Sequence, residues 1–402
     1  MEVFRFILII IIVIIFAIVI YNLLKERSSI LKEKEQRNIE GMTMLDRVDD
    51  IFSSTVKISI EDSKLTKLLS IKDYCIKGSY NSAYTGLKIS SDALKYVLSR
   101  GCRIIDLQIH YSFEDGIPYV GNIVDPEGID MESENRISLY NIFTTILINA
   151  FMPTQGNDGC PNPKDPLIIH MRVIPDKRDN RSIKDMTPAQ RSIANKSCLV
   201  YESIAKCIKQ VFPQDKRLLM GNGNALQLFD PFDSSKINFF NLVPTNSNEN
   251  TMVANRISQK VIFLMDTRNN SEYKYNSQTF YNMINGETGG TTIQIYEYGK
   301  YPAKKPPLIK DNGFQTNITD EKIVIPDLLG DIKEPNIINM VIDSGVQITL
   351  YPFYLKKKEE LNRYEALFNH YNSAIIPMAY AIRYLDELKT YFENKTLKLG
   401  PF

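Results

Sequence analysis

The hydrophobic pattern of this chain changes twice along its length. An uninterrupted apolar run from Phe6 to Leu24 (FILIIIIVIIFAIVIYNLL) contains no charged residue. The stretch from Lys25 to about Gln36 is charged and has no core pattern, and apolar residues then recur at spacings of three and four from Met42 to Phe52, which predicts a helix. After Tyr74, short apolar runs alternate with amphipathic stretches, which predicts strands and helices in turn.

The alternating part predicts an α/β fold with a mostly parallel, closed sheet, for which a TIM-type (β/α)8 barrel is the natural closure. The expected strands are Tyr74–Lys77, Arg103–Ile109, Pro118–Ile123, Leu167–Val173, Arg217–Met220, Val261–Met265, Thr292–Tyr296 and Val346–Leu350. The expected helices include Ser91–Ser99, Leu139–Phe151, Pro188–Val211 and Glu334–Ile342. The chain is helical again from Lys356 to Leu397, with a break near Pro377.

The apolar run near the amino terminus predicts a single transmembrane helix. At a rise of about 1.5 Å per residue it can cross a hydrocarbon core of about 30 Å. A signal peptide would have a shorter apolar centre followed by small residues, whereas this run ends in Lys25, Glu26 and Arg27. We therefore expect an anchor at residues 1–24, a juxtamembrane stalk and helix at 25–73, a barrel at 74–351 and a C-terminal helical region at 352–402.

Charge and cysteine content indicate on which side of the membrane the large domain lies and which classes of partner are excluded. Positive residues that follow the span place the large domain on the cytosolic side. Five cysteines, an odd number without metal-type spacing, are typical of reduced thiols. A net charge of +1 argues against a nucleic-acid partner that relies on bulk attraction, and 44% hydrophobic residues suffice for a large core. We expect the lipid membrane itself to be a partner.

Three segments in the first half of the barrel region carry a family resemblance. They are Gly78–Gly86 (GSYNSAYTG), Ser99–Gln108 (SRGCRIIDLQ) and Asp165–Arg172 (DPLIIHMR). In this order they resemble the X region of phosphatidylinositol-specific phospholipase C, in which the first strand ends in a Ser-His-Asn-Thr-Tyr type turn. The second strand of that family carries Gly-Cys-Arg and then Glu-x-Asp. A turn at Gly116-x-Pro118 and a looser similarity near the end extend the resemblance to about Pro377.

The resemblance implies a phospholipase C-like phosphodiesterase barrel. In that family two histidines act as base and acid on the phosphodiester, and a calcium ion offsets the phosphate charge. Here Tyr80 stands at the first histidine position, and the second falls on Asn122, or on Val120 if the alignment shifts. Tyrosine, with a reference pKa near 10, is a poor base at neutral pH. The inherited mechanism is therefore not expected to operate.

The calcium ligands implied by the resemblance are also incomplete. Asn81 and Asp106 match ligand positions, but Gln108 replaces the second acid and Arg172 takes the place of the last. A guanidinium in that place repels calcium, so we expect no metal and no other cofactor. We expect Arg172 to reach Asp106 instead, from the strand that would be the fourth of the barrel. Tyr80, Asn81, Asp106 and Asn122 should converge at the C-terminal ends of the strands.

Two alternatives remain open for the other polar residues. His110 and His170 lie at strand spacing from Asp106 and Arg172, so they form either a different acid–base pair or barrel-lining groups satisfied by hydrogen bonds. Arg103, with Asp106 and Arg172, belongs either to a structural ion-pair cluster or to a phosphate site.

The preferred interpretation is an inactive barrel at a membrane, structural or binding a phosphate or inositol head group through Asn81, Arg103, Asp106, Gln108 and Arg172. The alternative is an active phosphodiesterase that uses His110 and His170. Heavy use of Ile, Asn and Lys indicates an AT-rich genome. A degenerate enzyme on an N-terminal anchor is typical of membrane proteins of large DNA virus particles, which adds a virion membrane and other virion proteins as a hypothesis.

Overall fold

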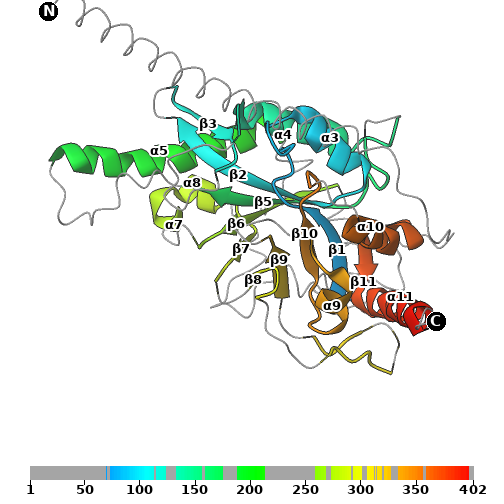
Figure 1. Ribbon diagram of the computed structural model, residues 1–402. Coiled ribbons are helices and arrows are strands. Elements are labelled where there is room, and N and C mark those ends of the chain that lie inside the picture. The colour runs from blue at the N-terminus through cyan, green and yellow to red at the C-terminus, as the bar shows by residue number, and fades with distance from the viewer. Residues whose placement is uncertain are drawn as a thin grey trace, which may run out of the picture.

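The computed structural model (Figure 1) describes part of the 402-residue chain. The described residues are 69, 73–112, 115–123, 133–155, 159–174, 188–212, 259–268, 273–290, 293–300, 306–311, 313, 315–318, 321–326, 334–355 and 359–397. The predicted span, stalk, helix at Met42–Phe52 and strand at Arg217–Met220 lie outside them. Within the described part, no helix has the length and apolar character needed to cross a bilayer.

Eight parallel strands form a closed barrel. Around the ring they are β1 (Tyr74–Ser79), β2 (Ile104–Ser112), β5 (Leu167–Val173), β6 (Val261–Asp266), β7 (Gly286–Thr288), β8 (Ile293–Glu297), β9 (Glu321–Ile325) and β10 (Ile348–Tyr351). The ring closes because β1 pairs with β10 on one side and with β2 on the other. Spatial order follows chain order throughout, which confirms the predicted α/β barrel.

Three further strands are antiparallel and lie outside the ring. β3 (Ile117–Val120) folds back on β2, β4 (Ile137–Ser138) pairs with β3, and β11 (Ile375–Pro377) pairs with the start of β1. The expectation that Pro118–Ile123 is a barrel strand is therefore wrong, because the turn at Gly116, with φ of 68°, reverses the chain. Arg172 accordingly lies on the third barrel strand, not the fourth.

Two barrel strands were absent from the sequence prediction. β7 reads Gly-Glu-Thr and has no apolar side chain, and β9 has only three consecutive apolar residues after Glu321 and Lys322. Such short segments become strands because their neighbours in the ring supply hydrogen-bond partners. Hydrophobic periodicity cannot reveal them.

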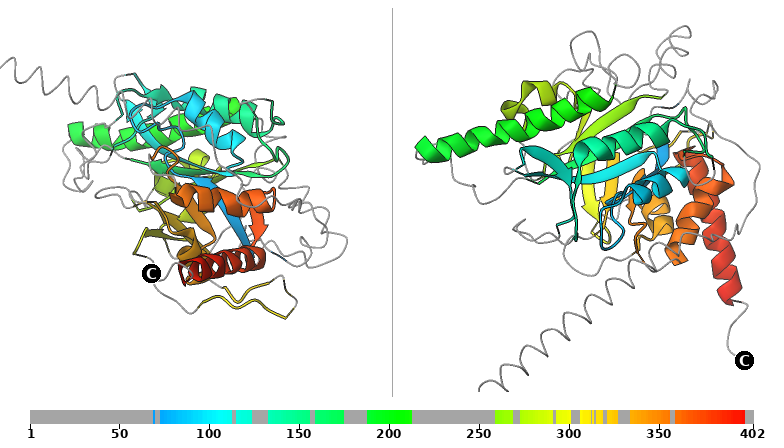
Figure 2. Two further views of the ribbon diagram at one scale, coloured as in Figure 1. Left: turned by 45° about the vertical axis from the view of Figure 1, so that its right-hand side comes forward. Right: turned by 90° about the horizontal axis from the view of Figure 1, so that it is seen from above.

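The helices gather on two sides of the barrel (Figures 1 and 2). One group is α3 (Ser91–Ser99), α4 (Leu139–Ala150) and α5 (Pro188–Val211), and the other is α9 (Ile337–Ile342), α10 (Glu359–His370) and α11 (Met378–Leu397). Two short helices, α7 (Tyr273–Asn276) and α8 (Gln278–Tyr281), follow β6. The helical region expected after Lys356 is interrupted near Pro377, as predicted, and the interruption is strand β11.

Alternation along the strands separates the barrel lumen from the outer core. On β2, Ile104 packs in the lumen cluster, whereas Ile105 and Leu107 pack with the helices of the first group. Asp106 and Gln108 share the side of Ile104, because successive residues of a strand point to opposite faces. The same alternation on β5 turns His170 and Arg172 toward the lumen, where polar side chains of neighbouring strands can meet.

Candidate functional site

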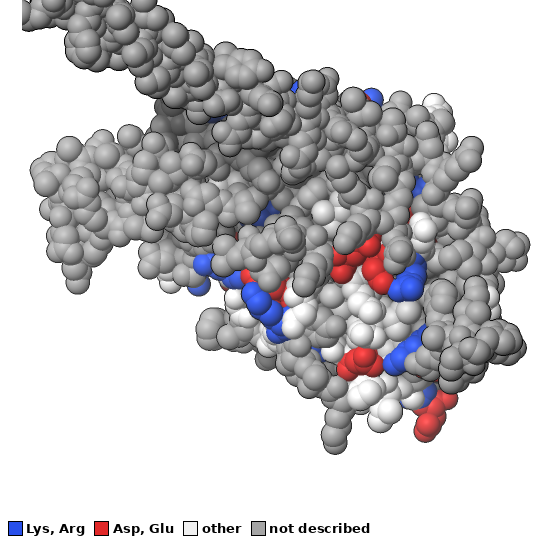
Figure 3. Space-filling view, in the orientation of Figure 1, with Lys and Arg blue, Asp and Glu red and all other residues white. Residues whose placement is uncertain are grey.

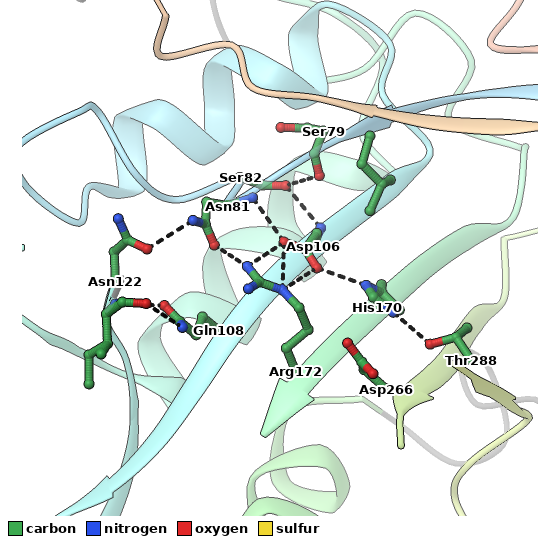
Figure 4. A network of polar contacts seen from close by, with 12 residues as sticks. Ser79, Asn81, Ser82, Asp106, Gln108, Asn122, His170, Arg172, Asp266 and Thr288 are labelled. Atoms are coloured by element: carbon green, nitrogen blue, oxygen red, sulfur yellow. Dashed lines mark hydrogen bonds and ion pairs between the residues drawn. The ribbon is translucent and has the colours of Figure 1, made fainter. Parts of the chain in front are cut away.

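A buried ion pair joins strands β2 and β5 inside the barrel (Figure 4). Nε of Arg172 lies 3.0 and 3.2 Å from the two carboxylate oxygens of Asp106, and its Nη2 lies 2.8 Å from Oδ2. The Arg172 side chain is 4% exposed and that of Asp106 is fully buried. The predicted contact between these two residues is confirmed.

The loop after β1 adds two residues to this pair. Asn81 has a φ of 42°, which asparagine tolerates better than most residues, and its backbone N–H donates to Asp106 Oδ2 at 2.9 Å. Its side-chain nitrogen donates to Asn122 Oδ1 at 2.9 Å, while its Oδ1 accepts from Arg172. The Arg172 guanidinium lies 4.5 Å from the centre of the Tyr80 ring. The predicted convergence of Tyr80, Asn81, Asp106 and Asn122 is confirmed, and their binding role stays a prediction.

The Gln108 side chain forms hydrogen bonds with the backbone that follows strand β3, beside the site. Its side-chain nitrogen donates to the Ile123 carbonyl at 2.9 Å, and its Oε1 accepts from the Ile123 N–H at 2.8 Å. This two-point contact fixes the segment that carries Asn122. Val120, the other position considered for the second histidine, is buried in the outer core.

The two histidines have separate surroundings. His170 Nδ1 lies 2.7 Å from Asp106 Oδ1, and its Nε2 lies 2.8 Å from the Thr288 hydroxyl, so both ring nitrogens are engaged. His110 stacks on Tyr119 at 5.6 Å, and its buried Nε2 has no hydrogen-bond partner in the described part of the chain. His170 therefore has no ring nitrogen left for His110, which argues against an acid–base pair of the two.

Arg103 does not belong to this cluster. Its guanidinium donates to the Pro166 and Ala150 carbonyls at 3.2 and 2.9 Å, to the Asp165 carbonyl, and to Cys160 Sγ at 3.0 Å. These partners precede β5 and lie at the N-terminal ends of the strands. The expectation of a cluster of Arg103 with Asp106 and Arg172 is wrong, because Arg103 precedes β2 and binds loop carbonyls at the opposite end.

Sequence reasoning missed several members of the network. Ser82 Oγ accepts from the Asp106 N–H at 3.0 Å, and Thr288 closes the chain of contacts through His170. A second ion pair, at 2.6 Å between the buried Asp266 and the partly exposed Arg268, lies at the end of β6. An acid that directly follows the predicted strand Val261–Met265 was a signal for that pair. Thr288 gave no signal, because it lies on an unpredicted strand.

Electrostatics fixes the protonation states at the site. Burial alone would raise the pKa of Asp106, but the charge of Arg172 and the hydrogen bond with His170 outweigh it and hold this pKa well below its usual range. Burial raises the pKa of the Tyr80 hydroxyl, so this group is a neutral donor. Burial, and then the charge of Arg172, lower the pKa of His110 to about 3. His110 is therefore neutral near pH 7 and cannot serve there as an acid.

The oxygen atoms of the site do not suit calcium. Calcium requires several oxygen ligands with free lone pairs. Both Asp106 oxygens accept hydrogen bonds, Asn81 Oδ1 accepts from Arg172, and Gln108 Oε1 accepts from a backbone N–H. Among the described residues, no three His, Cys, Asp or Glu side chains are grouped as metal ligands. The residues present do not fit a calcium ion.

Comparisons with known proteins give a distant likeness in fold. No protein-family model matches the chain, and no curated protein does. Two solved structures, PLC21 of S. officinalis and of L. pealei, are each 12% identical with a TM-score of 0.44, over 79% of this chain and 38% of the other. The chain therefore spans little more than a third of their length. A calcium-dependent phosphoinositol-specific phospholipase C of Pseudomonas sp is 10% identical with a TM-score of 0.41, over 80% of this chain and 100% of the other. Likeness at this level carries no conclusion about chemistry.

Proposed function

We propose that this chain is a catalytically inactive barrel that acts at a membrane, as a structural module or as a binding module for a phosphate-bearing head group such as inositol phosphate. The observation that carries the proposal is the ion pair of Arg172 with Asp106. It occupies the centre of the site with a guanidinium that stays charged. Inositol-phosphodiester cleavage needs a base and an acid, and the positions considered for them hold Tyr80 and Asn122.

The same site retains donors for an anion. Arg172 has five N–H groups, and its Nη1 donates to none of the described residues. Burial keeps the Tyr80 hydroxyl protonated by raising its pKa, and the nearby Arg268 side chain is 28% exposed. These donors support binding of a phosphate oxygen at the C-terminal mouth of the barrel, where ligands of this fold bind.

The partners and the location belong to the same proposal. The apolar run at Phe6–Leu24 would hold the barrel beside lipid, with the large domain on the cytosolic side or, in a virion, beneath its membrane. In the part of Figure 3 that is not grey, acidic and basic side chains of the described residues are interspersed. The net charge of +1 likewise gives no bulk attraction for nucleic acid. We propose lipid and other membrane or virion proteins as partners, and no nucleic acid.

The test uses the full chain in a maltoside detergent. We expect no hydrolysis of phosphatidylinositol, either with calcium or with EDTA, and measurable binding of inositol phosphate by calorimetry. Tyr80→Phe keeps the ring under Arg172 but removes one hydrogen bond worth about 1 kcal/mol, so binding should weaken about fivefold.

The matched control is Tyr140→Phe, which removes a hydroxyl from the exposed face of α4 and should leave binding unchanged. Calcium-dependent hydrolysis would refute the inactive barrel and revive the alternative with His110 and His170. Equal affinity of the Tyr80→Phe variant would show that the anion does not bind at this mouth.

A further inference from the structure

An aromatic pocket lies beside the polar network at the mouth of the barrel. It is open to solvent on one side, has a cavity volume of about 50 Å³, and lies between the loop after β1, helix α3 and the segment after β10. Tyr84 meets Tyr354 edge to face at 4.9 Å and 71°, and Tyr96 meets Phe353 at 6.2 Å and 78°. Its walls are therefore built from two pairs of nearly perpendicular rings.

The lining of this pocket carries a negative charge. Asp92, in the first turn of α3, is the one charged side chain among the described residues that line the pocket. Its carboxylate is 71% exposed and lies 3.9 Å from Lys95, a contact too exposed to hold it firmly. Ser79 also lines the pocket, and its buried Oγ has no hydrogen-bond partner in the described part of the chain. The lining thus combines a carboxylate, a free hydroxyl and aromatic faces.

These features select for a class of ligand. Aromatic faces are electronegative and attract cations, and a carboxylate at the rim adds to this attraction while disfavouring anions. A primary ammonium needs hydrogen-bond acceptors all around it, and although the lining includes Asp92 and several serines, its aromatic rings supply none at their faces. A quaternary ammonium needs none and is the cation that aromatic cages recognise.

We propose that this pocket binds a quaternary ammonium group, such as the trimethylammonium of a choline head group. Tyr80 and Asn81 line the pocket and also contact Arg172, so a phosphate joined to that cation would lie toward the polar network. The proposal rests on the rings and on Asp92, and it stands whether or not Arg172 binds phosphate.

The first test compares the affinity of the chain for a charged ligand and for an uncharged ligand of the same shape. The full chain, kept in a maltoside detergent that contains no choline, is titrated with choline and with its neutral isostere 3,3-dimethylbutan-1-ol, and binding is followed by calorimetry. We expect choline to bind at least tenfold more tightly than the isostere, because only the cation is attracted by ring faces and by a carboxylate. Equal affinities, or no binding of choline, would overturn the proposal.

Variants place the binding in this pocket. Tyr96→Leu removes a half-buried ring and should weaken choline binding about tenfold, whereas Tyr96→Phe keeps the ring and should bind like the wild type. Asp92→Asn should weaken binding about threefold, and Asp386→Asn, on the exposed face of α11, should have no effect. An unchanged affinity of both Tyr96→Leu and Asp92→Asn would place any choline site elsewhere and refute the proposal.

The last comparison separates the two sources of the ligand. Free phosphocholine and vesicles of phosphatidylcholine are offered to the chain, with phosphatidylglycerol vesicles as the control. Vesicle binding that requires the choline lipid and is lost in Tyr96→Leu supports a lipid ligand, and binding of free phosphocholine alone supports a soluble one. Failure of both would overturn the proposal, while inositol phosphate binding would be untouched.

Discussion

At the scale of the residue, the site is defined by one carboxylate and the donors around it. Asp106 receives hydrogen bonds from Arg172, from the Asn81 backbone and from His170. A buried charge is tolerated only when it is paired, and removal of one partner of such a pair commonly costs about 3–5 kcal/mol. The guanidinium therefore gives Asp106 a partner within the protein, where a metal-binding barrel would leave the carboxylate for an ion.

At this scale, burial of His110 should make the free energy of unfolding depend on pH. Burial lowers its pKa from 6.5 to about 3, so the folded state resists protonation that the unfolded state accepts. The free energy of unfolding should therefore be intact above about pH 6.5 and should fall by about 1.4 kcal/mol per pH unit as pH drops toward 3. His110→Phe keeps a ring on Tyr119 and removes this titration. Urea denaturation at pH 6, 5 and 4 gives the free energy of unfolding at each pH. Its fall per pH unit should be smaller in the variant by about that amount.

The comparison for this experiment is His370→Phe, because the His370 side chain is more exposed and burial lowers its pKa less strongly. Most of the slope should persist in that variant. A slope in His110→Phe equal to that of the wild type would show that the folded chain binds a proton at His110 after all.

At the scale of elements, helix α10 is fixed to the start of the barrel by buried polar contacts. The Glu365 carboxylate lies 2.6 Å from Lys77 Nζ of β1, with both side chains at most 2% exposed. The Tyr364 hydroxyl accepts from the Gly78 N–H at 2.7 Å and lies 2.9 Å from its carbonyl. A C-terminal helix thus completes the hydrogen bonding of the first strand.

Glu365→Gln should be strongly destabilising. The substitution leaves Lys77 charged and buried without its carboxylate, so we expect the free energy of unfolding to fall by about 3–5 kcal/mol. Glu360→Gln is the matched control on the same helix, because Glu360 contacts Arg363 on the more exposed face and should contribute less than about 1 kcal/mol. Denaturant titration measures both, and similar small losses would argue against a structural role of the buried pair.

At the scale of the whole molecule, the barrel and the C-terminal region share strand pairing and an apolar cluster. β11 pairs with Tyr74–Ile76 of β1, and side chains of α9, α10 and α11 share one apolar cluster with Cys75 and Tyr351. The predicted boundary between 74–351 and 352–402 therefore separates segments that share a hydrophobic core. The chain must be synthesised through Pro377 before the first strand has all its neighbours.

A chain truncated after Tyr351 should fail to fold cooperatively. It would lack β11, Glu365 and the helices that cover the outer face of β1, and the exposed apolar surface favours aggregation. A chain truncated after Leu397 keeps these elements and is the control. Thermal unfolding followed by circular dichroism should give a sharp transition for the control alone, and a sharp transition of the shorter chain would mark the barrel as independent.

Local periodicity accounts for the part of the fold that sequence predicted. The bounds of Ser91–Ser99, Pro188–Val211 and Leu167–Val173 agree with α3, α5 and β5. The two helices carry an amphipathic pattern and the strand is rich in apolar residues, so their own side chains specify the element. β7, β9 and the reversal into β3 were missed or misplaced because their conformation depends on neighbouring strands and on one turn.

The sequence by itself determined the class of fold and the identity of the ion pair. Apolar strands separated by helices require a parallel, covered sheet, and a buried Arg172 requires an acid, of which Asp106 is the one suggested by the family pattern. Only the tertiary structure decided which polar residues meet. The register of β2 and β5 places Asp106 opposite His170, and Arg172, two residues further along β5, contacts the same carboxylate. Arg103 lies at the other end of β2 and binds loop carbonyls. Spacing along a strand gives the face of a side chain, but its partners depend on the pairing of strands distant in sequence.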